Sequence, residues 1–185
     1  CYGCSIRNLH SMLLCLSLFF LCTLSKGNLV DWIHARLTGI IELMTLTFYI
    51  IGFLALALCV GGMVFFAIVV APMVFIHLDE INAGKLIRAM FPWYYLFVII
   101  TAIIAAGVYA YQLNYASVGL AVTAVGALYS RQILMGKINI ARDAMIIGDK
   151  DSNHLFDKLH KRSVRINALG LLTAIGAIVY VGIQH

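Results

Sequence analysis

Three long stretches of the chain are apolar and contain no Asp, Glu, Lys or Arg. They run from 44 to 75, from 89 to 130 and from 166 to 184, and a polar turn at 112–117 interrupts the second. An α-helix needs about 20 mainly apolar residues to cross a bilayer. We therefore predict four membrane spans, whose approximate limits are 44–70, 93–112, 117–135 and 165–183.

The apolar residues in these stretches do not alternate with polar ones, and Ala, Gly, Leu and Ile dominate. This pattern favours helices over the alternating strands of a membrane β-barrel. We predict an all-α fold, a polytopic membrane four-helix bundle with short interfacial helices.

Several local features refine this prediction. Pro72 is expected to end or kink the first span. Residues 82–90 are predicted to form a short interfacial helix, and Pro92 starts the second span within an aromatic group, 91–95, that suits the headgroup belt. The third span is predicted to continue as one helix to about 147, before a turn at 148–153.

The amino-terminal part differs from the rest. We interpret residues 1–43 as an extension and 44–183 as the four-helix transmembrane domain. Met12–Leu24 resembles a signal-peptide core or a short extra membrane segment, and 29–43 is predicted to lie on the membrane surface. Cys1 and Cys4 form a single C-x-x-C pair without the second pair that a zinc site would need.

Composition supports the membrane assignment. The 185-residue chain is 63% hydrophobic and 11% charged, with a mean hydropathy of +0.97. An ordinary soluble domain has about 25% charged residues. These values exclude an ordinary soluble domain and place the chain among helical membrane proteins.

The formal net charge of +5 follows membrane topology rather than nucleic-acid binding. Lys and Arg are concentrated in the loops 77–92 and 131–165, and the turn at 112–117 has none. The positive-inside rule places both basic loops in the cytoplasm. A basic cluster that is expected to contact anionic lipid headgroups precedes the last span; it comprises Lys158, Lys161, Arg162 and Arg165.

A polar stripe leads into the last span. Phe156, His160, Ser163 and Asn167 follow one another at steps of four, three and four, so they share one helix face. Polar side chains that enter a membrane need a partner or a function.

Another polar group is expected opposite this stripe. Asn139, Arg142 and Asp143 share a face of the preceding helix, and Arg88 belongs to the other basic loop. Two readings are open for the polar cluster: its residues form a ligand site at the cytoplasmic boundary, or they only join helices. The cluster comprises seven residues: Arg88, Asn139, Arg142, Asp143, His160, Ser163 and Asn167.

Other chemistry has less support in the sequence. His77 is a single candidate metal ligand near a helix end. The chain contains no H-E-x-x-H, Walker or G-x-S-x-G motif, and we assign no catalytic residue and no cofactor.

Four groups of residues together resemble a known family. They are Gly61–Phe66 with Val70–Pro72, Phe91–Pro92–x–Tyr94–Tyr95, Asn139–x–x–Arg142–Asp143, and the stripe from Phe156 to Asn167. In this order they resemble the bacterial domain of unknown function 4149 and the eukaryotic transmembrane protein 205. The resemblance covers about 44–183 and implies a small four-helix protein without an established activity.

The resemblance also bears on location and function. It implies the bacterial inner membrane, and a distant similarity to copper-resistance D-type proteins and to one type of protoporphyrinogen oxidase. We predict a non-enzymatic membrane protein that binds a small ligand, lipid or partner at the polar cluster and that is able to form a homo-oligomer. The alternatives are a metal or small-molecule transport or resistance factor, and a haem- or porphyrin-linked oxidoreductase.

Overall fold

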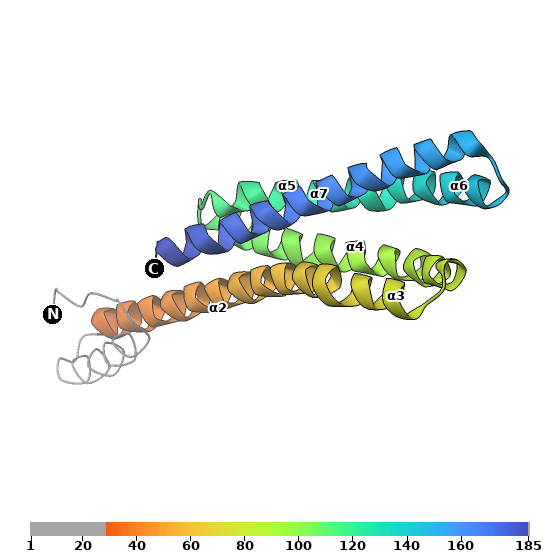
Figure 1. Ribbon diagram of the computed structural model, residues 1–185. Helices are drawn as coiled ribbons and strands as arrows, with labels where there is room; N and C mark the ends of the chain where they lie inside the picture. The colour runs from red at the N-terminus through yellow and green to blue at the C-terminus, as the bar shows by residue number, and fades with distance from the viewer. Residues whose placement is uncertain (1–28, 185) are drawn as a thin grey trace. The chain divides into compact units, whose positions relative to one another are not determined.

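The computed structural model describes residues 29–184, and these residues form helices joined by short turns (Figure 1). The predictions for Met12–Leu24, Cys1 and Cys4 therefore lie outside the described residues. The elements are α2 (Leu29–Phe65), the π-helical segment η1 (Phe66–Val70), α3 (Ala71–His77), α4 (Glu80–Tyr111), α5 (Ala116–Tyr129), the π-helical segment η2 (Ser130–Leu134), α6 (Met135–Ile146) and α7 (Lys150–Ile183).

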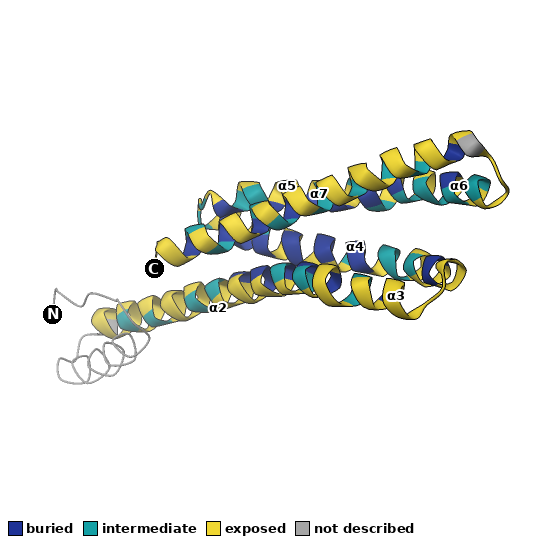
Figure 2. Ribbon diagram, viewed as in Figure 1, coloured by how far each residue is buried: buried dark blue, intermediate teal, exposed yellow. Residues whose placement is uncertain are grey.

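Four helical stretches are long and apolar enough to cross a membrane. They are Val30–His77, Glu80–Tyr111, Ala116–Ile146 and Asp151–Ile183. Many residues along them are exposed (Figure 2). Large apolar residues are among them, which suits helices surrounded by lipid. The predicted all-α membrane bundle is confirmed.

The chain divides into two compact units after Ile50. In the first unit, the described residues form the first turns of α2. Their hydroxyl groups bond to the backbone one turn earlier: Thr45 Oγ1 donates to the Ile41 carbonyl at 2.8 Å, and Thr47 Oγ1 donates to the Leu43 carbonyl at 2.8 Å. Such bonds satisfy a hydroxyl without help from another element.

The amino-terminal helix limits differ from the prediction. Residues 29–43 form the first turns of α2, which continues without interruption to Phe65; their predicted position on the membrane surface stays a prediction. Similarly, residues 82–90 are helical, but they form the first turns of α4 rather than a separate interfacial helix. Pro92 lies inside α4, so the predicted start of a helix at this residue is wrong. The apolar run on both sides of Pro92 keeps α4 continuous although one backbone donor is missing.

Pro72 does not end the first span. The helix passes through η1 immediately before Pro72 and continues as α3 to His77. The Ala71 amide donates to the Phe66 carbonyl, five residues earlier. This wider turn accommodates a residue that has no backbone donor.

Polar residues fix the turns between the long helices. The Asp79 carboxylate caps α4 and accepts hydrogen bonds from the backbone amide of Asn82 at 3.3 Å and from its side-chain Nδ2 at 2.6 Å. The side-chain bond, more than the backbone bond, holds the pKa of Asp79 below its ordinary value. At the opposite end, Leu113 adopts φ 53°, and Asn114 Oδ1 accepts the Ala116 amide at 2.9 Å.

The third long helix extends beyond its apolar part, as predicted. It passes from α5 through η2 into α6, and a turn at 147–149 leads into α7. Gly148 has φ +99°, a conformation that suits glycine, and Asp149 caps α7 by accepting the Asp151 amide at 3.2 Å.

In the second unit, α5 packs against both α4 and α7, and α6 packs against α7 (Figure 1). Small residues allow these helices to approach closely. A Cβ atom placed on Gly119 of α5 would lie 3.2 Å from the Thr173 carbonyl oxygen of α7. Because that oxygen belongs to a helix backbone, it cannot move aside as a flexible side chain could.

We predict that Gly119→Leu will lower the thermal unfolding temperature in mild detergent by roughly 2–12 °C. Overpacking a close contact costs roughly 1–3 kcal/mol, and each kcal/mol shifts the midpoint by about 2–4 °C for a chain of this size. Gly107→Leu is the matched control, because a Cβ on Gly107 meets no atom within 4 Å. Equal midpoints for the two variants would contradict the close α5–α7 contact.

Candidate functional site

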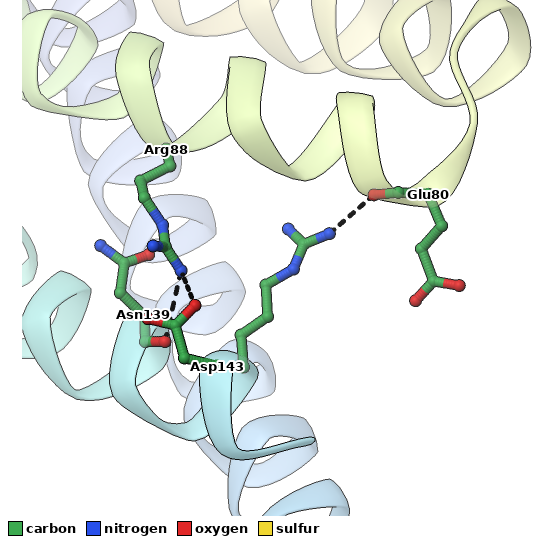
Figure 3. A network of polar contacts seen from close by, with 5 residues as sticks. Glu80, Arg88, Asn139 and Asp143 are labelled. Carbon is green, nitrogen blue, oxygen red and sulfur yellow. Dashed lines mark hydrogen bonds and ion pairs between the residues drawn. The ribbon is translucent and has the colours of Figure 1, made fainter. Parts of the chain in front are cut away.

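The predicted polar cluster contains an ion pair between α4 and α6. Arg88 Nη2 of α4 lies 2.5 Å from Asp143 Oδ1 of α6 and donates to the Asn139 carbonyl at 3.4 Å (Figure 3). The two charged side chains are 41% and 55% exposed. Ion pairs with this exposure typically contribute about 0–1 kcal/mol. The pair therefore aligns the two helices more than it stabilises them.

Arg142 provides another link between the same helices. Its Nη2 donates to the Glu80 carbonyl at 2.8 Å, and its guanidinium group lies over Gly84, where a Cβ atom would overlap it. Gly84 is buried in the first turns of α4. The missing side chain at this position therefore makes room for the arginine that joins α6 to the start of α4.

Two residues of the polar stripe bond to a different part of the protein. Tyr94 of α4 donates its hydroxyl to Asn167 Oδ1 of α7 at 2.9 Å, and the hydroxyls of Tyr95 and Ser163 lie 3.0 Å apart. Both tyrosines are buried, with relative exposures of 8% and 2%. Each bond pairs a hydroxyl that would otherwise face an apolar interior.

His160 lies apart from these bonds. It is exposed, and its ring stacks on Phe156, with 5.8 Å between the ring centres. We predicted that His160 faces Arg142 and Asp143, but residue spacing does not fix how one helix is rotated against another. The structure therefore distributes the seven candidates between the α4–α6 junction, the buried tyrosine pair and an exposed part of α7. Their binding of a ligand stays a prediction.

The tyrosine pair belongs to an aromatic cluster that the sequence reading missed. Phe66 of η1 stacks on Tyr94 at 4.2 Å between ring centres, and Phe91 stacks on Tyr95 at 5.5 Å. We expected residues 91–95 to lie in the headgroup belt, but among the aromatic ones only Trp93 is strongly exposed, at 74%. The i, i+4 spacing of Phe91 and Tyr95 was the available signal for a shared face.

The basic cluster on α7 is exposed, and its side chains do not link α4 to α6 as Arg88 and Arg142 do. Lys161 pairs with Asp157 at 2.7 Å within α7, and the Arg162 guanidinium lies 5.2 Å from the centre of the Tyr129 ring. Lys158 and Arg165 are exposed, and no ion pair or hydrogen bond links either side chain to another described residue. These two cations are therefore the most available for an external anion.

Among the described residues, no group of three or more His, Cys, Asp and Glu side chains could hold a metal ion. His77 is exposed at the end of α3.

The four long apolar helices and their buried hydroxyl contacts define an integral membrane protein of the helical bundle class. Residues 54–146 match the family model described as a domain of unknown function, DUF4149, and the chain belongs to this family. No curated protein and no solved structure matches the chain. The match supports the bacterial part of the predicted resemblance, whereas the resemblance to transmembrane protein 205 stays a prediction.

We predict that Tyr94 and Asn167 will be energetically coupled. A double-mutant cycle with Tyr94→Phe and Asn167→Ala should give a coupling free energy of about 0.6 kcal/mol, which is typical of hydrogen bonds between membrane helices. The free energy of unfolding can be measured by denaturing-detergent titration.

The control cycle combines Tyr94→Phe with Ser163→Ala, because Ser163 bonds to Tyr95 instead. Its coupling should be clearly smaller, because no direct hydrogen bond joins Tyr94 to Ser163. Equal coupling in the two cycles would contradict the pairing of Tyr94 with Asn167.

Proposed function

We propose that this protein binds anionic phospholipid headgroups at the cytoplasmic membrane boundary through the basic cluster of α7. The observation that carries the proposal is the position of exposed cations directly before an uncharged apolar helix. Arg165 is exposed, and residues 166–184 contain no charge. A cation at this point lies at the depth of the lipid phosphates when the apolar part spans the bilayer.

The other cations in the predicted cluster suit this function less well. Arg88 bonds to the Asp143 carboxylate and Arg142 bonds to the Glu80 carbonyl, so both guanidinium groups already have protein acceptors. An anion would have to compete with these contacts. Lys158 and Arg165 of α7 could bind a phosphate without breaking an ion pair between described residues.

The arrangement of the basic segments supports a common membrane side. Contacts of Arg88 and Arg142 bring the first turns of α4 to the end of α6, and α6 packs against α7. Both basic loops therefore lie at one end of the second unit. The turn at the other end, residues 112–115, has no Lys or Arg. The positive-inside rule assigns the basic end to the cytoplasm, where anionic lipids attract basic segments.

We predict opposite accessibility for the two ends of the bundle. In a cysteine-free background expressed in bacterial cells, Tyr115→Cys should react with a membrane-impermeant maleimide in intact cells. Asp151→Cys should react only after lysis, because the basic end is cytoplasmic. Both residues are exposed, so their own burial does not limit labelling. The reverse labelling pattern would contradict the orientation.

We predict that Lys158→Gln/Arg165→Gln will weaken the binding of phosphatidylglycerol about 30-fold. Each cation near a membrane surface contributes about 1 kcal/mol, and 1.36 kcal/mol corresponds to a factor of ten. Native mass spectrometry of the purified protein can follow phosphatidylglycerol binding, with phosphatidylcholine as the neutral lipid. Added salt should reduce the preference for the anionic lipid.

The matched control is Lys85→Gln/Lys137→Gln. It removes the same charge from exposed positions on α4 and α6. Binding should change little in this variant. An equal loss in both variants would show non-specific charge attraction, and equal binding of the two lipids by the unmodified protein would contradict the function.

A further inference from the structure

A small cavity lies among α2, α4, α5, η2 and α7, beside the tyrosine pair. Its volume is about 10 Å³, which is close to the minimum that holds one water molecule. Most of its lining is apolar, but several polar side chains also contribute. The lining residues that the argument uses are Met63, Tyr95, Ser130 and Asn167.

Ser130 supplies a buried hydroxyl group that has no hydrogen-bond partner among the described residues. The residue is 1% exposed, and it lines the cavity together with Tyr95. A buried polar atom left in this state costs about 1–3 kcal/mol. Because Ser130 lines the cavity, a molecule there can satisfy its hydroxyl.

The helix around Ser130 does not supply a partner for its hydroxyl group. In an α-helix, a serine hydroxyl commonly bonds to a carbonyl in the preceding turn. Thr123, seven residues before Ser130, bonds in this way to the Gly119 carbonyl at 3.0 Å. Ser130 begins the π-helical segment η2, and no carbonyl of the described residues accepts its hydroxyl. Such widened turns are frequent at functional sites in helices.

The other polar groups of the cavity have hydrogen-bonding capacity left. Asn167 uses Oδ1 to accept the Tyr94 hydroxyl, and no described acceptor bonds to its two Nδ2 protons. Tyr95 and Ser163 share one hydrogen bond, and each hydroxyl has one donor and two acceptor positions. A water molecule in the cavity would therefore have three polar partners, which is typical of buried water.

We propose that this cavity is an intramembrane binding site for one water molecule. The water accepts a hydrogen bond from Asn167 Nδ2 and bonds to the hydroxyls of Ser130 and Tyr95. It thereby joins the two pairs Tyr94–Asn167 and Tyr95–Ser163 into one chain of hydrogen bonds across α4, η2 and α7. The site does not depend on lipid binding at the basic cluster, which uses none of these side chains.

Radiolytic footprinting of the full-length protein in mild detergent tests this site. X-ray pulses generate hydroxyl radicals from bound water, and these oxidise adjacent methionines. Met63 lines the cavity and is only 1% exposed, so bulk radicals do not reach it. We expect Met63 to be oxidised in the unmodified protein and at least about fivefold less in Ser130→Val, because the added methyl groups fill the cavity. Met73, which is 50% exposed, monitors the radical dose and should react equally in both proteins.

A second variant distinguishes the loss of the water molecule from a folding defect in Ser130→Val. Ser130→Ala removes the hydroxyl without adding volume, and the water loses one of its three partners. Met63 oxidation should then fall while the unfolding temperature stays near that of the unmodified protein. The proposal is overturned if Met63 is unreactive in the unmodified protein. It is also overturned if folded Ser130→Val and Ser130→Ala proteins oxidise Met63 as fast as the unmodified protein.

Discussion

The need to pair polar groups away from water governs the second unit of this structure. A lipid environment offers no hydrogen bonds, so each buried hydroxyl must find its partner within the protein. The Tyr94 and Tyr95 hydroxyls form hydrogen bonds to Asn167 and Ser163 of α7. The Thr123 hydroxyl of α5 donates to the Gly170 carbonyl at 3.0 Å. Each bond connects helices that the chain places far apart, so polar pairing selects the neighbours and the facing sides.

The same need explains the irregular turns. Where Pro72 removes a backbone donor, η1 widens the helix and preserves its continuation to His77. Where η2 begins in the third helix, the Ser130 hydroxyl has no hydrogen-bond partner among the described residues and faces a small cavity. In the first case the irregularity accommodates a missing donor, and in the second it adjoins an unpaired hydroxyl. The second case therefore points to a bound molecule, and the first does not.

The sequence predicted the long helices because lack of charge over about 20 residues has one common cause, a bilayer. It also predicted the projecting third helix and the turn near Gly148. It did not predict the burial of Tyr94 and Tyr95, because an amphipathic ring suits both the headgroup region and a buried site with a polar partner. The choice depends on Asn167 and Ser163, which lie about 70 positions later. Spacing showed that these two residues share a face, but it could not show which helix that face contacts.

The seven candidate residues illustrate the same limit. Counting from the turn near Gly148 places residues of α6 and α7 at similar depths, yet helix rotation separates His160 from Arg142 and Asp143. Charge composition could not distinguish arginines that have protein acceptors from those that remain available. That difference depends on Gly84, where the missing side chain makes room for Arg142.

The family match and the hydrogen bonds together show that the matched region depends on helix α7. The matched region ends at residue 146 and includes both tyrosines, whereas Ser163 and Asn167 lie beyond it on α7. The matched region therefore contains the two tyrosine hydroxyls, but the residues that bond to them lie outside it, on α7. Since an unpaired buried hydroxyl costs more than one bond contributes, α7 is needed for the stability of the region that defines the family. The exposed cations of α7 are then carried by a helix whose position is already fixed by polar bonds inside the membrane.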